Sequence, residues 1–154
     1  MYAALLADLE ASGLASLARS STWLYPIANL VHVLGAALLV GAIAVFDVLL
    51  LRDRAQLAAS IAATALAVAA LGLLLQLASG SILLAAEATA LGRNPAFIVK
   101  MVLIAVGLVN IAFFHWRWRS LRAGMPPAGV RLQAGVSLSV WVCVLLLGRL
   151  IAYV

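Results

Sequence analysis

A few ionisable side chains interrupt a sequence that is otherwise strongly apolar. His32 and Lys100 lie within long aliphatic runs, and Glu87 and Arg149 lie near the ends of two others. An imidazole can ligate a metal or accept a proton, whereas ammonium and guanidinium groups bind carboxylates and phosphates. Ionisable groups in apolar surroundings are costly, so each of these four is a candidate for function.

The composition indicates that the surrounding solvent is lipid. The 154-residue chain is 67% hydrophobic and 10% charged, with a mean hydropathy of +1.20. A typical soluble domain has about 25% charged residues, and so few polar groups would not cover a water-exposed surface. The length allows one domain. The single cysteine, Cys143, excludes an internal disulfide.

Four apolar runs predict four transmembrane helices, over residues 23–51, 57–86, 95–118 and 130–153. Each run reaches or exceeds the ~20 residues that a bilayer requires. The connections are short, so we expect an all-α integral membrane protein with an up-down-up-down four-helix bundle. Residues 1–22 precede this domain and carry apolar residues at helical spacing, which predicts a short amphipathic helix at the interface or a partly ordered tail.

The distribution of arginines predicts the orientation in the membrane. The loops after the first and third apolar runs carry the excess of bases: Arg52, Arg54, Arg117, Arg119, Arg122 and Arg131. Basic loops stay in the cytoplasm, so both termini are expected outside a bacterial inner membrane. The net charge of +5 is thereby explained without a nucleic-acid partner.

The depths of the polar residues place them in the outer half of the bundle. At 1.5 Å per residue, His32 lies about 13 Å and Lys100 about 7 Å from the outer ends of their helices. Tyr25, Asn29 and His32 lie within about 60° of one another on one helix face. The sequence therefore predicts an outward-facing polar pocket formed by Tyr25, Asn29, His32, Glu87, Lys100 and Arg149.

Structural roles are the alternative for several of these residues. Glu87 and Lys100 flank one short connection and could pair, and Lys100 and Arg149 could extend toward lipid phosphates. His32 is too deep and too short for that. A histidine bonded to a neighbouring helix is as common as one that binds a ligand, so both roles remain open for His32.

The inner end of the bundle offers fewer candidates. Asp47 lies near the end of the first helix, within reach of Arg52 or Arg54. His115 precedes an aromatic and basic segment that is typical of an interfacial anchor. The depths of His32 and His115 differ by about 15 Å, which is too far for both to hold one haem iron.

Three segments resemble a family of small uncharacterised four-helix membrane proteins of bacteria: YPIANLVHVLGAALLVGAIAVFDVLLL, SILLAAEATALGRNPAFIVKMVLIAVGLVNIAFFH and WVCVLLLGRLIAY. The histidine in a glycine-containing first helix and the lysine near the start of the third are distantly similar to two haem-associated families. These are the HemJ-type protoporphyrinogen oxidases and the CopD-like proteins with a cytochrome b561-like bundle. The HemJ resemblance implies roles for His32 and Lys100. His115 lies farther from Lys100 than the third-helix histidine of the HemJ type lies from its lysine. The Leu-Pro-Arg segment that follows the first-helix histidine in the HemJ type is also missing, so oxidase activity is not carried over.

The leading expectation is a small b-type haem protein that serves electron transfer or haem-linked redox chemistry. His32 would ligate the iron, with His115 as the less favoured ligand, and Lys100 and Arg149 would face the haem propionates. The first alternative is a carrier or binding protein for a small anionic or amphiphilic molecule. The second is a structural accessory subunit. A homo-oligomer or a redox partner is compatible with the sequence, which leaves open whether the chain is an enzyme.

Overall fold

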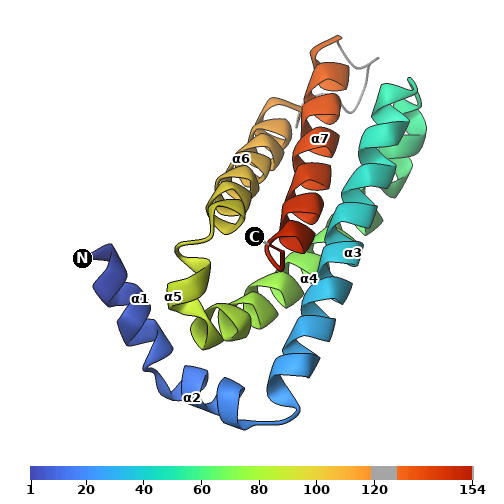
Figure 1. Ribbon diagram of the computed structural model, residues 1–154. Coiled ribbons are helices and arrows are strands. Elements are labelled where there is room, and N and C mark those ends of the chain that lie inside the picture. The colour runs from blue at the N-terminus through green and yellow to red at the C-terminus, as the bar shows by residue number, and fades with distance from the viewer. Residues whose placement is uncertain (119–127, 154) are drawn as a thin grey trace.

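All regular structure in the described residues, 1–118 and 128–153, is helical in the computed structural model (Figure 1). Four helices are long and apolar enough to cross a membrane: α3 (Leu24–Leu51), α4 (Ala55–Ala86), α6 (Pro95–Trp118) and α7 (Ala128–Leu150). Three shorter helices complete the described chain: α1 (Tyr2–Glu10), α2 (Gly13–Ser20) and α5 (Ala88–Leu91). The all-α prediction is confirmed, whereas Arg119 and Arg122 lie outside the described residues.

The ends of the long helices follow from local chemistry. α3 ends at a tight turn in which Asp53 has a φ of 56°, in the left-handed region that aspartate tolerates better than most residues. α6 begins at Pro95, a favoured first helical residue. The side chain of Asn94 caps it by accepting a hydrogen bond from the Phe97 amide at 3.1 Å.

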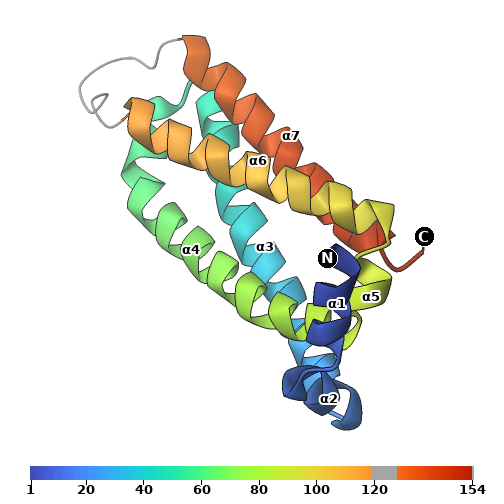
Figure 2. The same ribbon diagram turned by 90° about the vertical axis from the view of Figure 1, so that its left-hand side faces the viewer.

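The long helices pack in the order α4, α3, α7, α6. α3 contacts both α4 and α7, and α7 also contacts α6. Within the described residues, α4 and α6 make no comparable contact and stand on the outer sides of this row (Figure 2). α4 and α6 are therefore not neighbours in this packing order.

Two glycines allow α3 and α4 to approach closely. A Cβ atom on Gly72 would lie 2.7 Å from the Gly35 carbonyl oxygen and 2.9 Å from the Leu39 Cα. A Cβ on Gly35 would in turn lie 2.9 Å from the Gly72 oxygen. Small residues at a helix crossing permit such backbone contact, which is a frequent device between membrane helices.

Two apolar clusters join α3 to its neighbours. One contains Leu39, Val40, Trp141 and Val144, and the other contains Leu50, Ala58, Val130 and Ala134. Trp141 is 1% exposed and is the largest fully buried side chain among the described residues. These pairings show that α3 runs antiparallel to both α4 and α7.

The N-terminal segment forms two docked helices where the sequence predicted one. Ser12 begins the second helix, because its side chain accepts a hydrogen bond from the Ala15 amide. Arg19 donates to the Ala86 carbonyl at the end of α4, at 3.2 Å. The Glu10 carboxylate accepts from the Thr89 amide at 2.8 Å, and hydrogen bonds from the Thr89 side chain and backbone lower the pKa of Glu10. Residues 1–20 are thus anchored to α4 and α5.

Candidate functional site

His32 is held by a hydrogen bond to the neighbouring helix. Its Nδ1 lies 3.0 Å from the Oγ of Ser79, which is 2% exposed. Ser79 also donates a hydrogen bond to the Leu75 carbonyl. A hydroxyl has one hydrogen, so when that of Ser79 is directed to Leu75, Ser79 accepts a hydrogen bond from Nδ1–H of His32. The Nε2 atom of His32 then carries a free lone pair, which is the form of imidazole that binds a metal or accepts a proton.

The imidazole is also positioned by two other residues of α4. The Gln76 side chain donates to the backbone oxygen of His32 at 2.8 Å. A Cβ on Gly80 would lie 3.1 Å from the His32 Cε1 atom, so the glycine provides the space beside the ring. Ser79 was not among the residues predicted from the sequence, although it is separated from Gln76 by the i, i+3 spacing of helix neighbours.

Lys100 brings a positive charge close to His32. Its side chain is partly buried, and the ammonium group is near enough for electrostatic interaction with the imidazole. A Cβ on Gly148 would lie 3.4 Å from the Lys100 Nζ atom, so the small residue leaves room for the ammonium group. Lys100 has no salt-bridge partner among the described residues. The positive charge on Lys100 therefore remains available to an anionic group.

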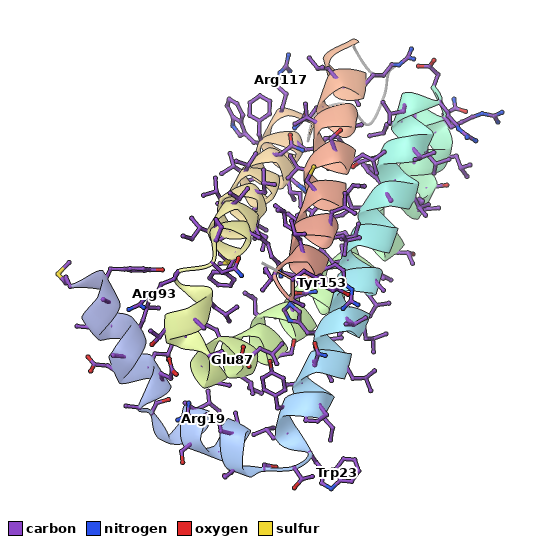
Figure 3. All side chains as sticks on the ribbon, in the orientation of Figure 1. Arg19, Trp23, Glu87, Arg93, Arg117 and Tyr153 are labelled. Carbon is purple, nitrogen blue, oxygen red and sulfur yellow. The ribbon has the colours of Figure 1, made fainter. Side chains whose placement is uncertain are left out.

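Other predicted pocket residues pair among themselves. Tyr25 donates to the Glu87 carboxylate at 3.2 Å, so Glu87 does not neutralise Lys100. Arg149 donates to the Tyr153 hydroxyl at 2.7 Å and lies 5.1 Å from the centre of its ring. Glu87 and Tyr153 lie in the same half of the molecule (Figure 3).

Asn29 and His115 do not join this group. Asn29 is exposed, and no hydrogen bond connects it to His32 within the described structure. His115 is exposed, with its Nδ1 bonded to the Ile111 carbonyl of its own helix at 3.0 Å. It lies 15 residues beyond Lys100, or about 22 Å along α6. Arg117, close to His115 in sequence, lies at the end of the molecule opposite Trp23 (Figure 3).

The site offers one imidazole as a candidate metal ligand. Its Nδ1 lies at hydrogen-bond distance from Ser79, and metal-bound histidines are usually held in this way at the nitrogen that does not touch the metal. No group of three or more His, Cys, Asp or Glu side chains in the described residues could hold a metal ion by itself. A porphyrin would bring its own four nitrogen ligands, so it needs no such cluster.

Two surface grooves lie away from His32. A groove of about 400 Å³ between α6 and α7 is lined by residues such as Phe113 and Arg117. A second, of about 370 Å³, lies between α3 and α4 around Gly41 and Ser60. Neither groove includes His32.

No protein-family model, curated protein or solved structure matches the chain. Its class therefore rests on the fold: an all-helical chain with four helices of the length and hydropathy of membrane spans. Its particular function rests on the site of His32, Ser79, Gln76 and Lys100.

Proposed function

We propose that this chain is a small membrane protein that binds b-type haem through His32. The observation that carries the proposal is the hydrogen-bond chain from His32 Nδ1 through Ser79 to the Leu75 carbonyl. This chain selects the tautomer that presents Nε2 as a ligand. When bound, haem would supply one-electron redox chemistry.

The other residues around His32 have defined roles in this proposal. Lys100 places a cation near the ligand, where it would bind a propionate carboxylate. Gln76 holds the α3 backbone at His32, and Gly80 leaves space for the imidazole. Arg149 lies beside Tyr153 and can contribute a second positive charge near the outer end.

Replacing Ser79 with alanine tests the proposal by removing the hydroxyl group that is bonded to His32 Nδ1. We expect haem affinity to fall by about 10- to 100-fold, as is usual when the hydrogen-bond partner of a metal-bound histidine is removed. The measurement is a titration of purified protein with ferric haem, followed by absorption. Ser81→Ala is the matched control, because Ser81 is exposed and bonds only to the Ala78 carbonyl. Equal affinities of the two variants would contradict a ligand role for His32.

A binding protein for a small anionic or amphiphilic molecule is the second candidate. The specific observation in its favour is that Lys100 is partly buried and has no salt-bridge partner among the described residues. Metal-free protoporphyrin IX is a suitable probe, since it is an anionic amphiphile without iron. If this candidate is right, the probe binds as tightly as haem and His32→Ala leaves its affinity unchanged.

The binding of either ligand should require Lys100. Lys100→Gln is expected to lower the affinity for haem or protoporphyrin by about 10- to 100-fold, which corresponds to the loss of one charge-assisted hydrogen bond. Arg93→Gln, which removes an exposed cation at the same connection, is the control. The two affinities are measured by absorption or fluorescence titration. Unchanged binding by Lys100→Gln would remove the anion-binding role.

We further propose that the four long helices cross a bacterial inner membrane in alternate directions, with both termini outside. The arginine excess in the loops after α3 and α6 supports this orientation. Periplasmic and cytoplasmic reporters fused at the C-terminus and within residues 119–127 should report outside and inside, respectively. A cytoplasmic C-terminus would overturn the orientation and place His32 in the inner half.

A further inference from the structure

A second buried polar site lies between α3 and α7, apart from His32. Asp47 is 5% exposed, and its Oδ2 atom has no hydrogen-bond partner. Ser137 of α7, also 5% exposed, is the polar side chain of α7 that interacts with the Asp47 carboxyl. The sequence had placed Asp47 within reach of Arg52 or Arg54, but neither forms a salt bridge with it.

The helices packed around Asp47 offer it no compensating charge. α4 carries no ionisable side chain between Ala55 and Ala86. On α7, Arg131 is engaged by Asp53 at 3.1 Å, and both groups are more than half exposed. On α6, His115 and Arg117 are exposed, and the contact toward α3 at this level is made by Phe114, whose ring meets the Phe46 ring edge-on at 5.6 Å. Among the described residues, an ionised Asp47 would therefore be buried without a counter-ion.

Another unsatisfied polar atom lies on the adjacent turn of α7. Trp141, four residues after Ser137 and on the same helix face, is 1% exposed, and its Nε1 has no hydrogen-bond partner. The Trp141 indole lies against Gly107 of α6, where a Cβ atom would be 3.4 Å from Nε1, so this nitrogen belongs to the α6–α7 contact and Asp47 is a separate unsatisfied group. A divalent metal is a poor fit, because no further carboxylate, histidine or cysteine joins Asp47 within the described residues.

We propose that Asp47 is a proton-binding site: it holds a proton in the folded protein, and the α3–α7 contact is built around the neutral carboxyl group. A neutral carboxyl avoids the large cost of an unpaired buried charge. It can also exchange donor and acceptor roles with the Ser137 hydroxyl. Release of the proton to water would leave a carboxylate between α3 and α7, so proton binding and helix packing are coupled at this point. The proposal does not depend on haem binding.

Infrared spectroscopy of the full-length protein tests the charge state directly. The other four carboxyl side chains, Asp8, Glu10, Asp53 and Glu87, are exposed or partly exposed, so Asp47 is the buried carboxyl side chain of the sequence. We expect one carbonyl-stretch band of a protonated carboxyl group at pH 7, shifted in heavy water and absent in Asp47→Asn. Asp53→Asn is the control and should retain the band. A wild-type protein without the band would overturn the proposal. This result does not depend on whether a variant folds.

The pH dependence of thermal unfolding gives a second readout. Raising the pH ionises Asp47, which the folded state tolerates less well than the unfolded state. The melting temperature of the wild-type protein should therefore fall relative to that of Asp47→Asn as the pH rises. The difference between the two melting temperatures should be smallest at acid pH. Sodium at constant ionic strength should leave the wild-type melting temperature unchanged. Parallel pH profiles for the two proteins, or specific stabilisation by sodium, would overturn the proton assignment.

Discussion

Replacing Gly72 with alanine is expected to lower the free energy of unfolding by about 1–3 kcal/mol, the usual cost of overpacking a tight contact. The added methyl group would lie 2.5 Å from the Leu39 nitrogen and 2.7 Å from the Gly35 oxygen. These neighbours are backbone atoms, so a rotamer change cannot relieve the clash. α3 and α4 would have to separate, and thermal unfolding in detergent or nanodiscs would measure the loss.

Gly41→Ala is the matched control for this prediction. Gly41 lies on the same helix as Gly35, but a Cβ there would have no neighbour within 4 Å. Alanine also has the higher helix propensity, so this variant should be as stable as the wild type or slightly more stable. Equal melting temperatures for the Gly72 and Gly41 variants would show that the close α3–α4 crossing does not exist.

Replacing His32 with alanine is expected to abolish haem binding or to shift its Soret absorption strongly, whereas His115→Ala should leave the spectrum largely intact. The His32 imidazole lies at hydrogen-bond distance from Ser79 of α4, and removing it removes the proposed iron ligand. His115 is exposed at the other end of α6 and bonds to the carbonyl of Ile111. Absorption spectra of the two variants, purified in parallel, make the comparison.

The opposite result would assign the haem site to another part of the protein. Loss of the Soret band only in His115→Ala would assign the haem to the end of α6 that carries Arg117. Loss in both variants would be informative only alongside their melting temperatures, since a misfolded His115 variant would also lose haem. A His115 variant that melts like the wild type but lacks haem would contradict the assignment to His32.

The helices could be predicted from the sequence because their signals are local. The long apolar runs, the Asn94–Pro95 start of α6 and the Arg52–Arg54 connection each act within a few residues. The predicted bounds of the long helices accordingly differ from the observed ones by at most three residues. The break at Ser12 was missed, because a single serine cap within an apolar periodicity is a weak signal.

The side-chain contacts between different helices could not be predicted in the same way. Ser79 and Ser137 are short side chains among many alanines and leucines, and their roles depend on where α3 crosses α4 and α7. A rotation of one helix by a single residue would place either serine on another face. Glu87 and Lys100 were expected to be close because they flank one connection, yet Glu87 bonds to Tyr25 of a different helix.

Absorption of the purified wild-type protein, oxidised and reduced, tests the central claim most directly. The protein is expected to show a Soret band as isolated or after addition of ferric haem, and the spectrum should change when dithionite reduces the iron. The Ser79→Ala protein should show less of the same band at equal haem concentration. A wild-type protein that is folded, colourless and still colourless after haem is added would contradict the haem proposal, and the anionic-ligand candidate would then take its place.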